Sequence, residues 1–220
     1  MHACYVTLVL SSVVNRGCSF RVNFTKVTER YIEQKNKTEG GKINSWGLTR
    51  DYAYWKQQIP SVQPVSAVVD WIIYGGCNKD MYRGPPKYNC SGFFSWSALD
   101  HIDCPFSIKH NTSLPIKYQL PKPKNISLDL NRLPAQHLIY HWGPPSRELE
   151  KKVFSPKCNF VAKITFDGYI VYNLTKPGSE NWVPVKNTDL ENRTEGLVVE
   201  SGQLTFYMWG VYFETMWCYQ

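Results

Sequence analysis

The sequence predicts a mainly β, disulfide-stapled and glycosylated domain, β-sandwich-like, with long Pro-rich loops and little helix. Three observations predict this class: short alternating apolar segments, cysteines spread along the chain, and many N-glycosylation sequons. Hydrophobic residues make up 43% of the 220 residues and aromatic residues 15%, so the chain can bury a core. The formal charge is +7. The basic residues are scattered and follow no nucleic-acid-binding motif, so we expect no nucleic-acid partner.

Alternation of apolar and polar residues indicates the first strands. Phe20, Val22 and Phe24 alternate with polar residues, which predicts a strand, and the following residues 26–38 are the best candidate for a helix. The run AVVDWIIY at 67–74 is short, rich in β-branched and aromatic residues, and ends at two glycines. We therefore expect a core strand there.

Two hairpins are predicted in the last third of the chain. Asp167-Gly168 lies between two β-forming runs within 159–174 and suits a type I′ turn, in which both central residues have positive φ. Ser201-Gly202 is expected to form the turn of a second hairpin, whose second arm is very aromatic.

The N-terminal and middle segments differ from the rest of the β-rich domain expected over 18–220. Residues 1–17 are largely apolar, and a signal peptide and an N-terminal strand explain them equally well. The segment at about 104–145 is rich in proline, which removes donors from strand ladders. We expect an extended Pro-rich connection with short strands.

Seven cysteines, none in a CxxC pair, predict disulfides rather than a redox motif or a zinc site. Cys4 lies in the apolar N-terminal run, and the other six are expected to be paired. Cys90 is expected to join Cys77 or Cys104, because both are near in sequence, and Cys158 is a candidate partner of Cys218. The six cysteines expected in disulfides are Cys18, Cys77, Cys90, Cys104, Cys158 and Cys218.

Seven sequons favour passage through a secretory pathway, which would place the chain on a cell surface or in the secreted fraction. A glycan is hydrophilic, so each modified asparagine is expected at the surface. The sequon asparagines are Asn23, Asn36, Asn89, Asn111, Asn125, Asn173 and Asn192.

No pattern typical of catalysis is present in the sequence. It has no GxSxG elbow, P-loop or dinucleotide fingerprint. His137 and His141 have the spacing of two metal ligands on a helix, but the HExxH glutamate is missing and β-branched Ile139 lies between them. We expect ordinary histidines there, and we expect no enzyme activity, no metal and no cofactor.

The stretch YNCSGFFSW at 88–96 combines a sequon, a cysteine and three large aromatic residues. A disulfide at Cys90 would limit the freedom of the loop and let its aromatics form a binding hot spot. Filling the core is the alternative, and it is the commoner role of such side chains. The candidate receptor-binding residues are Tyr82, Arg83, Tyr88, Phe93 and Trp96.

Several short motifs resemble the surface subunit of betaretroviral and related endogenous envelope glycoproteins. They are VVDWIIYGG (68–76) followed by YRGPPKYNCSG (82–92), LNRLPAQHLIYHW (130–142), PKCNFVAKITFDG (156–168) and NWVPV (181–185). The resemblance implies a fragment or truncated endogenous copy that attaches to a host cell-surface receptor. It further implies a fusion (transmembrane) subunit as partner and possible trimers. No run beyond the N-terminal segment approaches the ~20 apolar residues of a membrane span, so we expect no direct membrane insertion. A secreted non-viral binding glycoprotein, such as a receptor decoy or a lectin-like module, is the alternative.

Overall fold

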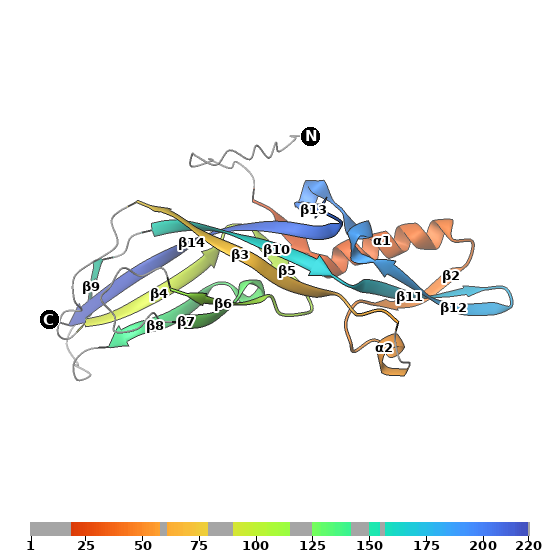
Figure 1. The fold of residues 1–220 in the computed structure, drawn as a ribbon, viewed down its shortest axis with the longest axis horizontal. Helices are drawn as coiled ribbons and strands as arrows, with labels where there is room; N and C mark the ends of the chain where they lie inside the picture. The colour runs from red at the N-terminus through yellow and green to blue at the C-terminus, as the bar shows by residue number, and fades with distance from the viewer. Residues whose placement is uncertain are drawn as a thin grey trace. The chain divides into compact units, whose positions relative to one another are not determined.

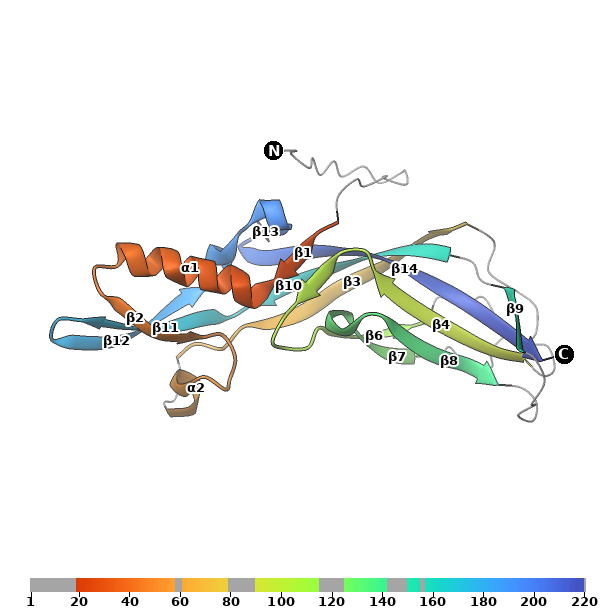
Figure 2. The ribbon, with the colours of Figure 1, turned by 180° about the vertical axis from the view of Figure 1, so that it is seen from behind.

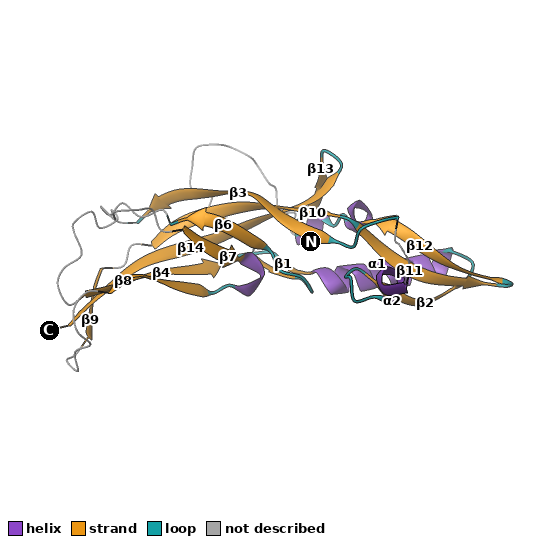
Figure 3. Cartoon of the chain, turned by 60° about the horizontal axis from the view of Figure 1, so that its bottom comes forward, coloured by secondary structure: helices purple, strands orange, loops and turns teal. Residues whose placement is uncertain are grey.

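The computed structural model describes residues 19–57, 61–78, 90–114, 125–141, 150–154 and 157–219. The prediction of a mainly β fold with little helix is confirmed, and strands dominate the chain (Figure 3). The chain divides into two compact units. Unit 1 comprises residues 1–66, 100–105 and 166–206, and unit 2 comprises residues 67–99, 106–165 and 207–220.

Unit 1 holds both α-helices and a three-stranded antiparallel sheet in the order β12-β11-β2. A short parallel pair joins β1 to β5. The elements of this unit are β1 (Arg21–Asn23), α1 (Phe24–Thr38), β2 (Lys42–Gly47), α2 (Ala53–Gln57), β5 (His101–Asp103), β11 (Tyr169–Lys176), β12 (Ser179–Lys186), the 3-10 turns η2 (Asn187–Leu190) and η3 (Arg193–Glu195), and β13 (Leu197–Glu200).

Helix α1 begins where an asparagine caps it. The side chain of Asn23 accepts a hydrogen bond from the backbone N–H of Lys26 at 2.9 Å, which satisfies a donor that the helix leaves free. Phe24, Val27 and Ile32 are buried on one face, and this face packs along β2 and β11 (Figures 1 and 2). The predicted helix is confirmed, but it starts at Phe24, so the alternating segment is a strand only over β1.

Unit 2 is built around a large sheet in the order β3-β10-β14-β4-β8. Strand β9 also pairs with β14, and β14 begins in unit 1, where β13 pairs with it. A separate two-stranded sheet joins β6 to β7. The elements are β3 (Ser66–Cys77), β4 (Cys90–Ala98), β6 (Lys109–Ser113), β7 (Asn125–Asp129), the 3-10 turn η1 (Leu130–Arg132), β8 (Ala135–His141), β9 (Glu150–Phe154), β10 (Lys157–Asp167) and β14 (Gln203–Tyr219).

The hairpin predicted at Asp167-Gly168 is wrong. Strand β10 belongs to the large sheet, whereas β11 pairs with β12 and β2, so the two strands do not face each other in one ladder. Gly168 has a φ of 105°, but Asp167 does not have the positive φ that a type I′ turn requires. A Cβ on Gly168 would collide with the carbonyl of Pro64, so close backbone approach, not hairpin geometry, explains this glycine.

The second predicted hairpin is confirmed. Ser201 and Gly202 have φ values of 51° and 78°, and Glu200 pairs with Gln203 across the turn between β13 and β14. Both central residues therefore have the positive φ of a type I′ turn.

Strand β3 includes the run predicted at 67–74, but it lies at the edge of the large sheet rather than in its centre. Its one acid, Asp70, is exposed. It accepts a hydrogen bond from the Thr165 hydroxyl at 2.7 Å and lies 3.5 Å from the Lys163 ammonium. An edge position lets one side of the strand reach solvent, which accommodates the carboxylate.

Among the described residues, a disulfide joins Cys77 to Cys158, both in unit 2. It excludes two of the predicted pairings, Cys77 with Cys90 and Cys158 with Cys218. The β4–β14 register instead brings Cys90 opposite Cys218 in the backbone ladder. Cys104 is buried, and Cys4 and Cys18 lie outside the described residues. The prediction assumed that cysteines near in sequence pair. In the structure, β3 and β10 are neighbours in the sheet, so Cys77 and Cys158 meet although 81 residues separate them.

Candidate functional site

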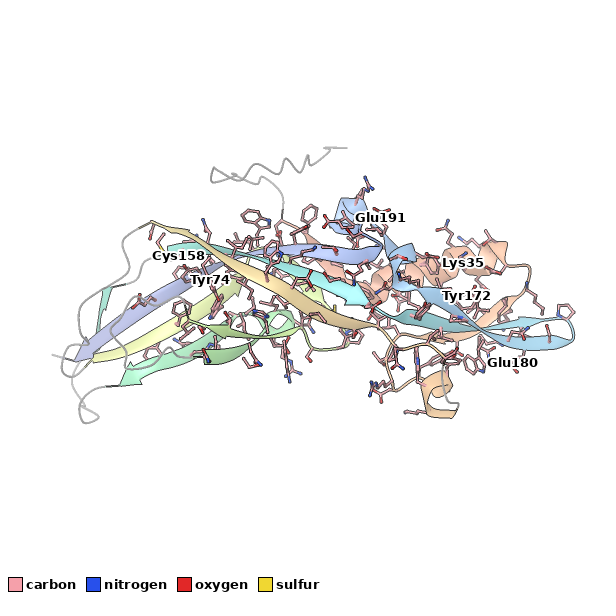
Figure 4. The ribbon with its side chains drawn as sticks, in the orientation of Figure 1. Lys35, Tyr74, Cys158, Tyr172, Glu180 and Glu191 are labelled. Carbon is pink, nitrogen blue, oxygen red and sulfur yellow. A yellow bond between two sulfur atoms is a disulfide. The ribbon has the colours of Figure 1, made fainter. Side chains whose placement is uncertain are left out.

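Unit 2 has an aromatic core on one face of its large sheet. Phe94 and Trp96 on β4 are fully buried, and the ring of Tyr212 on β14 stacks on Phe94 with centroids 5.1 Å apart. Trp96 also lies 5.2 Å from Phe160 of β10 and 5.6 Å from Tyr74 of β3. Four strands therefore contribute to one continuous aromatic cluster, which we call the ring cluster. Figure 4 labels Tyr74 within it.

One carboxyl group lies on the same face of this sheet. Glu214 follows Tyr212 by two residues on β14, so both side chains point to the same face, and the register places Glu214 opposite Phe94. Its side chain is 0% exposed, and neither carboxylate oxygen has a hydrogen-bond partner among the described residues. Burial raises the pKa of the Glu214 carboxyl to about 8, because an ionised carboxylate loses its hydration there.

The β6–β7 hairpin covers the ring cluster. The hydroxyl groups of Tyr74 and Thr112 lie 2.9 Å apart, which brings the inner face of β6 against the rings. On β7, Ile126 and Leu128 are buried and alternate with exposed residues. The hairpin is thus amphipathic, with an apolar face toward the sheet and a polar face toward solvent.

The hairpin has no ladder to the sheet beneath it. Within the described part of the chain, β6 and β7 pair with each other and form a sheet of their own. The base of the hairpin is closed locally, because the Asp129 carboxylate accepts from the backbone N–H of Ile108 at 2.9 Å and the N–H of Leu130 donates to the Ile108 carbonyl. Side-chain packing, not backbone pairing, joins the hairpin to the large sheet.

The outer face of the hairpin carries its two sequons, and exposed Lys109 lies on the same face at the base, in register with Asp129. Asn111 and Asn125 are exposed, and the register places Asn111 opposite Ser127 and Ser113 opposite Asn125. The Ser113 hydroxyl lies 2.6 Å from the Asn125 side-chain oxygen. The solvent face is therefore uncharged and polar over these four positions.

The predicted receptor-binding residues do not form one surface. Trp96 is 0% exposed and lies in the ring cluster, so its assignment to a receptor contact is wrong. Phe93 is half-buried and points to the opposite face of β4, because side chains alternate along a strand. Tyr82, Arg83 and Tyr88 lie outside the described residues.

The sequon asparagines differ in exposure. Asn36 is exposed like the two on the hairpin, while Asn23 and Asn192 are half-buried, and Asn89 lies outside the described residues. The expectation of a surface position fails at Asn173, which is 6% exposed. Its amide nitrogen donates to the Glu180 carboxylate at 2.7 Å, so a glycan on that nitrogen does not fit this arrangement.

The described residues contain no group of three or more His, Cys, Asp or Glu side chains that could hold a metal ion. His137 lies on β8 opposite Phe94, and β8 continues to His141, so the pair belongs to a strand rather than to a helical ligand site. None of the helices that the structure describes is long and apolar enough to cross a membrane.

Sequence reasoning missed Glu214. The sequence pattern indicated it: Glu214 is an even number of residues from Phe206, Met208 and Tyr212, so in a strand all four side chains lie on the same face. An acid on the apolar face of such a strand is unusual unless it is paired or neutral.

Comparison with known proteins gives little at the level of sequence: no family model and no curated protein matches the chain. Among solved structures, a non-toxic crystal protein from Bacillus thuringiensis is similar, with a TM-score of 0.43 and 14% identity over 90% of this chain and 94% of that chain. The Cry23Aa1 and Cry37Aa1 binary protein complex is also similar, with a TM-score of 0.40 and 12% identity over 89% of this chain and 85% of that chain.

These neighbours correct the expected resemblance to envelope surface subunits. Neither of them is a retroviral envelope protein, and no sequence match supports an envelope subunit. The assignment as a viral surface subunit is therefore wrong, and none of the comparisons supports a host receptor or a fusion subunit as its partner. Its motifs were short, and in this chain they fall largely on β-strands, where aromatic and β-branched residues are common in any fold.

Proposed function

We propose that this chain acts on membranes without catalysing a reaction: the β6–β7 hairpin leaves the ring cluster and enters a lipid bilayer. One observation carries the proposal. The hairpin buries an apolar face against the sheet of unit 2 but has no backbone ladder to that sheet. It can therefore exchange protein for lipid on its apolar face while it keeps its own hydrogen bonds.

The earlier expectation of no membrane insertion relied on the lack of a long apolar run. A long apolar run is required of a membrane-spanning helix, whereas an amphipathic strand needs apolar residues only at every second position. Each described arm has five residues, about half of what a membrane-crossing strand uses. In the sequence, the alternation continues beyond Leu114 with Ile116, Tyr118 and Leu120.

A single hairpin in a bilayer would leave backbone groups unpaired at both edges, and each such group is costly in hydrocarbon. Hairpins from several copies can satisfy these groups by pairing edge to edge. Their polar faces, represented here by Asn111, Ser113, Asn125 and Ser127, would then line a water-filled passage. The net charge of +7 favours approach to an anionic membrane surface.

The absence of catalysis is part of the same proposal. The strongly shifted acid of unit 2, Glu214, is enclosed by the sheet and the ring cluster instead of facing solvent. A general acid or base must reach a substrate, and a carboxyl that is 0% exposed does not.

Passage through a secretory pathway is also proposed. The Cys77–Cys158 disulfide supports it, because disulfides form and persist in oxidising compartments. The exposed sequon asparagines Asn36, Asn111 and Asn125 support it as well.

The test places one fluorescent amino acid at Ile126, on the inner face of the hairpin, or at its neighbour Ser127, on the outer face. Vesicles of phosphatidylcholine and phosphatidylserine with brominated acyl chains serve as quenchers. If the hairpin inserts, bromolipid should quench the fluorophore at position 126 but not the one at position 127. Iodide dissolved in the water should quench the fluorophore at position 127 but not the one at position 126.

Circular dichroism before vesicles are added shows whether each labelled protein is folded. Release of a trapped dye should rise more steeply than linearly with protein concentration if several copies assemble. A folded protein whose label at 126 stays unquenched by bromolipid, at pH 6 and at pH 9, would make the hairpin a permanent cover and end the proposal.

A further inference from the structure

We propose that Glu214 is a pH-operated latch on the β6–β7 hairpin: the hairpin stays docked while the carboxyl is neutral and is released when the carboxyl ionises. The inference rests on the proposed function for its purpose, but docking and release can be measured without any membrane.

The environment of the Glu214 carboxyl favours its neutral form over its ionised form. Glu214 is fully buried, faces the side of the sheet that the hairpin covers, and stands opposite the Phe94 ring. Its oxygens have no hydrogen-bond partner among the described side chains and backbone groups. An isolated carboxylate in such surroundings is strongly unfavourable unless water or a cation reaches it.

Contiguous contacts connect this carboxyl to the hairpin. The Phe94 ring opposite Glu214 stacks on Tyr212, the Tyr212 ring lies 5.5 Å from Tyr74, and the Tyr74 hydroxyl lies 2.9 Å from that of Thr112 on β6. Water admitted to Glu214 must part these packed rings or lift the cover above them. Because the hairpin has no backbone hydrogen-bond ladder to the large sheet, we expect the hairpin to be the element that moves.

The direction of the pH effect follows from the raised pKa. The folded state, with a carboxyl pKa of about 8, binds the proton more tightly than the open state, whose carboxyl has the ordinary value of 4.5. Docking is therefore fully favoured below about pH 4.5 and weakens as the pH rises toward 8. One linked proton changes the docking equilibrium by up to about tenfold per pH unit in this window, and no further above it.

Other titratable groups face the same region, and the variants in the test below distinguish their pH effects from that of Glu214. His110 on β6 pairs with buried Leu128, and His137 on β8 stands opposite Phe94. Asp129 closes the base of the hairpin on β7, and the Tyr74 and Tyr212 hydroxyls belong to the ring cluster. On the other side of β14, β9 brings Lys151 and Lys152 into register with Cys218 and Trp217, while β10 carries Lys163, which pairs with Asp70.

The experiment follows amide hydrogen exchange in residues 109–113 and 125–129 at pH 5 to 9 for the native chain and for Glu214→Gln. The ratio of the two proteins at each pH cancels the intrinsic pH dependence of exchange. The native hairpin should lose protection relative to Glu214→Gln by up to about tenfold per pH unit between pH 5 and pH 8. Glu33→Gln, at an exposed position on α1, should follow the native chain.

Three results would overturn the latch. One is equal pH dependence in the native chain and in Glu214→Gln. Another is a pH dependence that disappears in His110→Asn with His137→Asn, which would assign the effect to the imidazoles. The third needs no variant: a melting temperature of the native chain that does not fall between pH 5 and pH 9 excludes a buried carboxyl as the controlling group, even if Glu214→Gln fails to fold.

The latch and the membrane function can fail separately. Bromolipid quenching at position 126 that is equal at pH 6 and pH 9 keeps the membrane function and removes the latch. Hairpin release above pH 8 without quenching at either pH keeps the latch and removes the membrane function.

Discussion

At the scale of single residues, the parity of a position along its strand decides its role. Phe93 and Trp96 are three residues apart on β4, yet one is half-buried and the other fully buried, because they lie on opposite faces. Glu214 has the parity of the ring cluster and becomes a buried acid. Asn173 is likewise buried, although its NLT sequon is identical in kind to those on the surface.

The first prediction concerns glycan occupancy. Secreted from mammalian cells, the chain should lose mass on deglycosylation, with glycans at exposed positions such as Asn36 and Asn111 and none at Asn173. The reason is that the Asn173 amide nitrogen is buried and donates to Glu180. Glycopeptide mass spectrometry measures each site. A fully occupied Asn173 in folded protein would contradict the packing of this strand, and an unglycosylated secreted chain would remove the secretory proposal.

At the scale of elements, the two positions predicted as hairpin turns show what a turn sequence can and cannot decide. Ser201-Gly202 forms the turn because β13 and β14 are adjacent strands of one sheet. Asp167-Gly168 has the better sequence for such a turn, but β10 and β11 have other partners. A turn motif therefore forms a hairpin only where the flanking strands also pair.

The second prediction concerns the turn between β13 and β14. Ser201 has a φ of 51°, which costs a non-glycine residue about 1–2 kcal/mol. Asparagine tolerates this conformation better, so Ser201→Asn should raise the free energy of unfolding by about 0.5 kcal/mol. Urea unfolding measures the change. The matched variant Ser201→Val should lower stability by about 1 kcal/mol or more, and the opposite order would mean that the turn is not type I′ in solution.

At the scale of the whole molecule, each of the two units is assembled from segments that are distant in sequence. Unit 2 takes its strands from three separate stretches of the chain, and the Cys77–Cys158 disulfide joins two of these stretches. Each unit thus depends on pairing between segments that are separated in the chain by residues of the other unit. Constraints on the unfolded chain should consequently matter for its stability.

The third prediction concerns this disulfide. Its cysteines are separated by 81 residues, and closing such a loop is expected to stabilise the folded state by roughly 4 kcal/mol in the chain-entropy model. Cys77→Ser with Cys158→Ser should lower the denaturation midpoint accordingly, measured by urea unfolding under oxidising conditions. The double variant also serves as the control for reductant: if added reductant lowers its midpoint as much as that of the native chain, another disulfide provides the stabilisation.

The sequence by itself determined the mainly β character, helix α1 to within two residues of its start, the β13–β14 turn and the presence of a strand at β3. These features depend on local periodicity, capping and turn chemistry, which residues near one another in the chain express. The tertiary structure alone decided that β10 leaves β11 for the large sheet, that Cys77 pairs with Cys158, that Trp96 is core, and that Glu214 is buried opposite Phe94. Strand pairing is the physical reason, because it joins segments distant in sequence, and the choice of partner determines which face of each strand is buried.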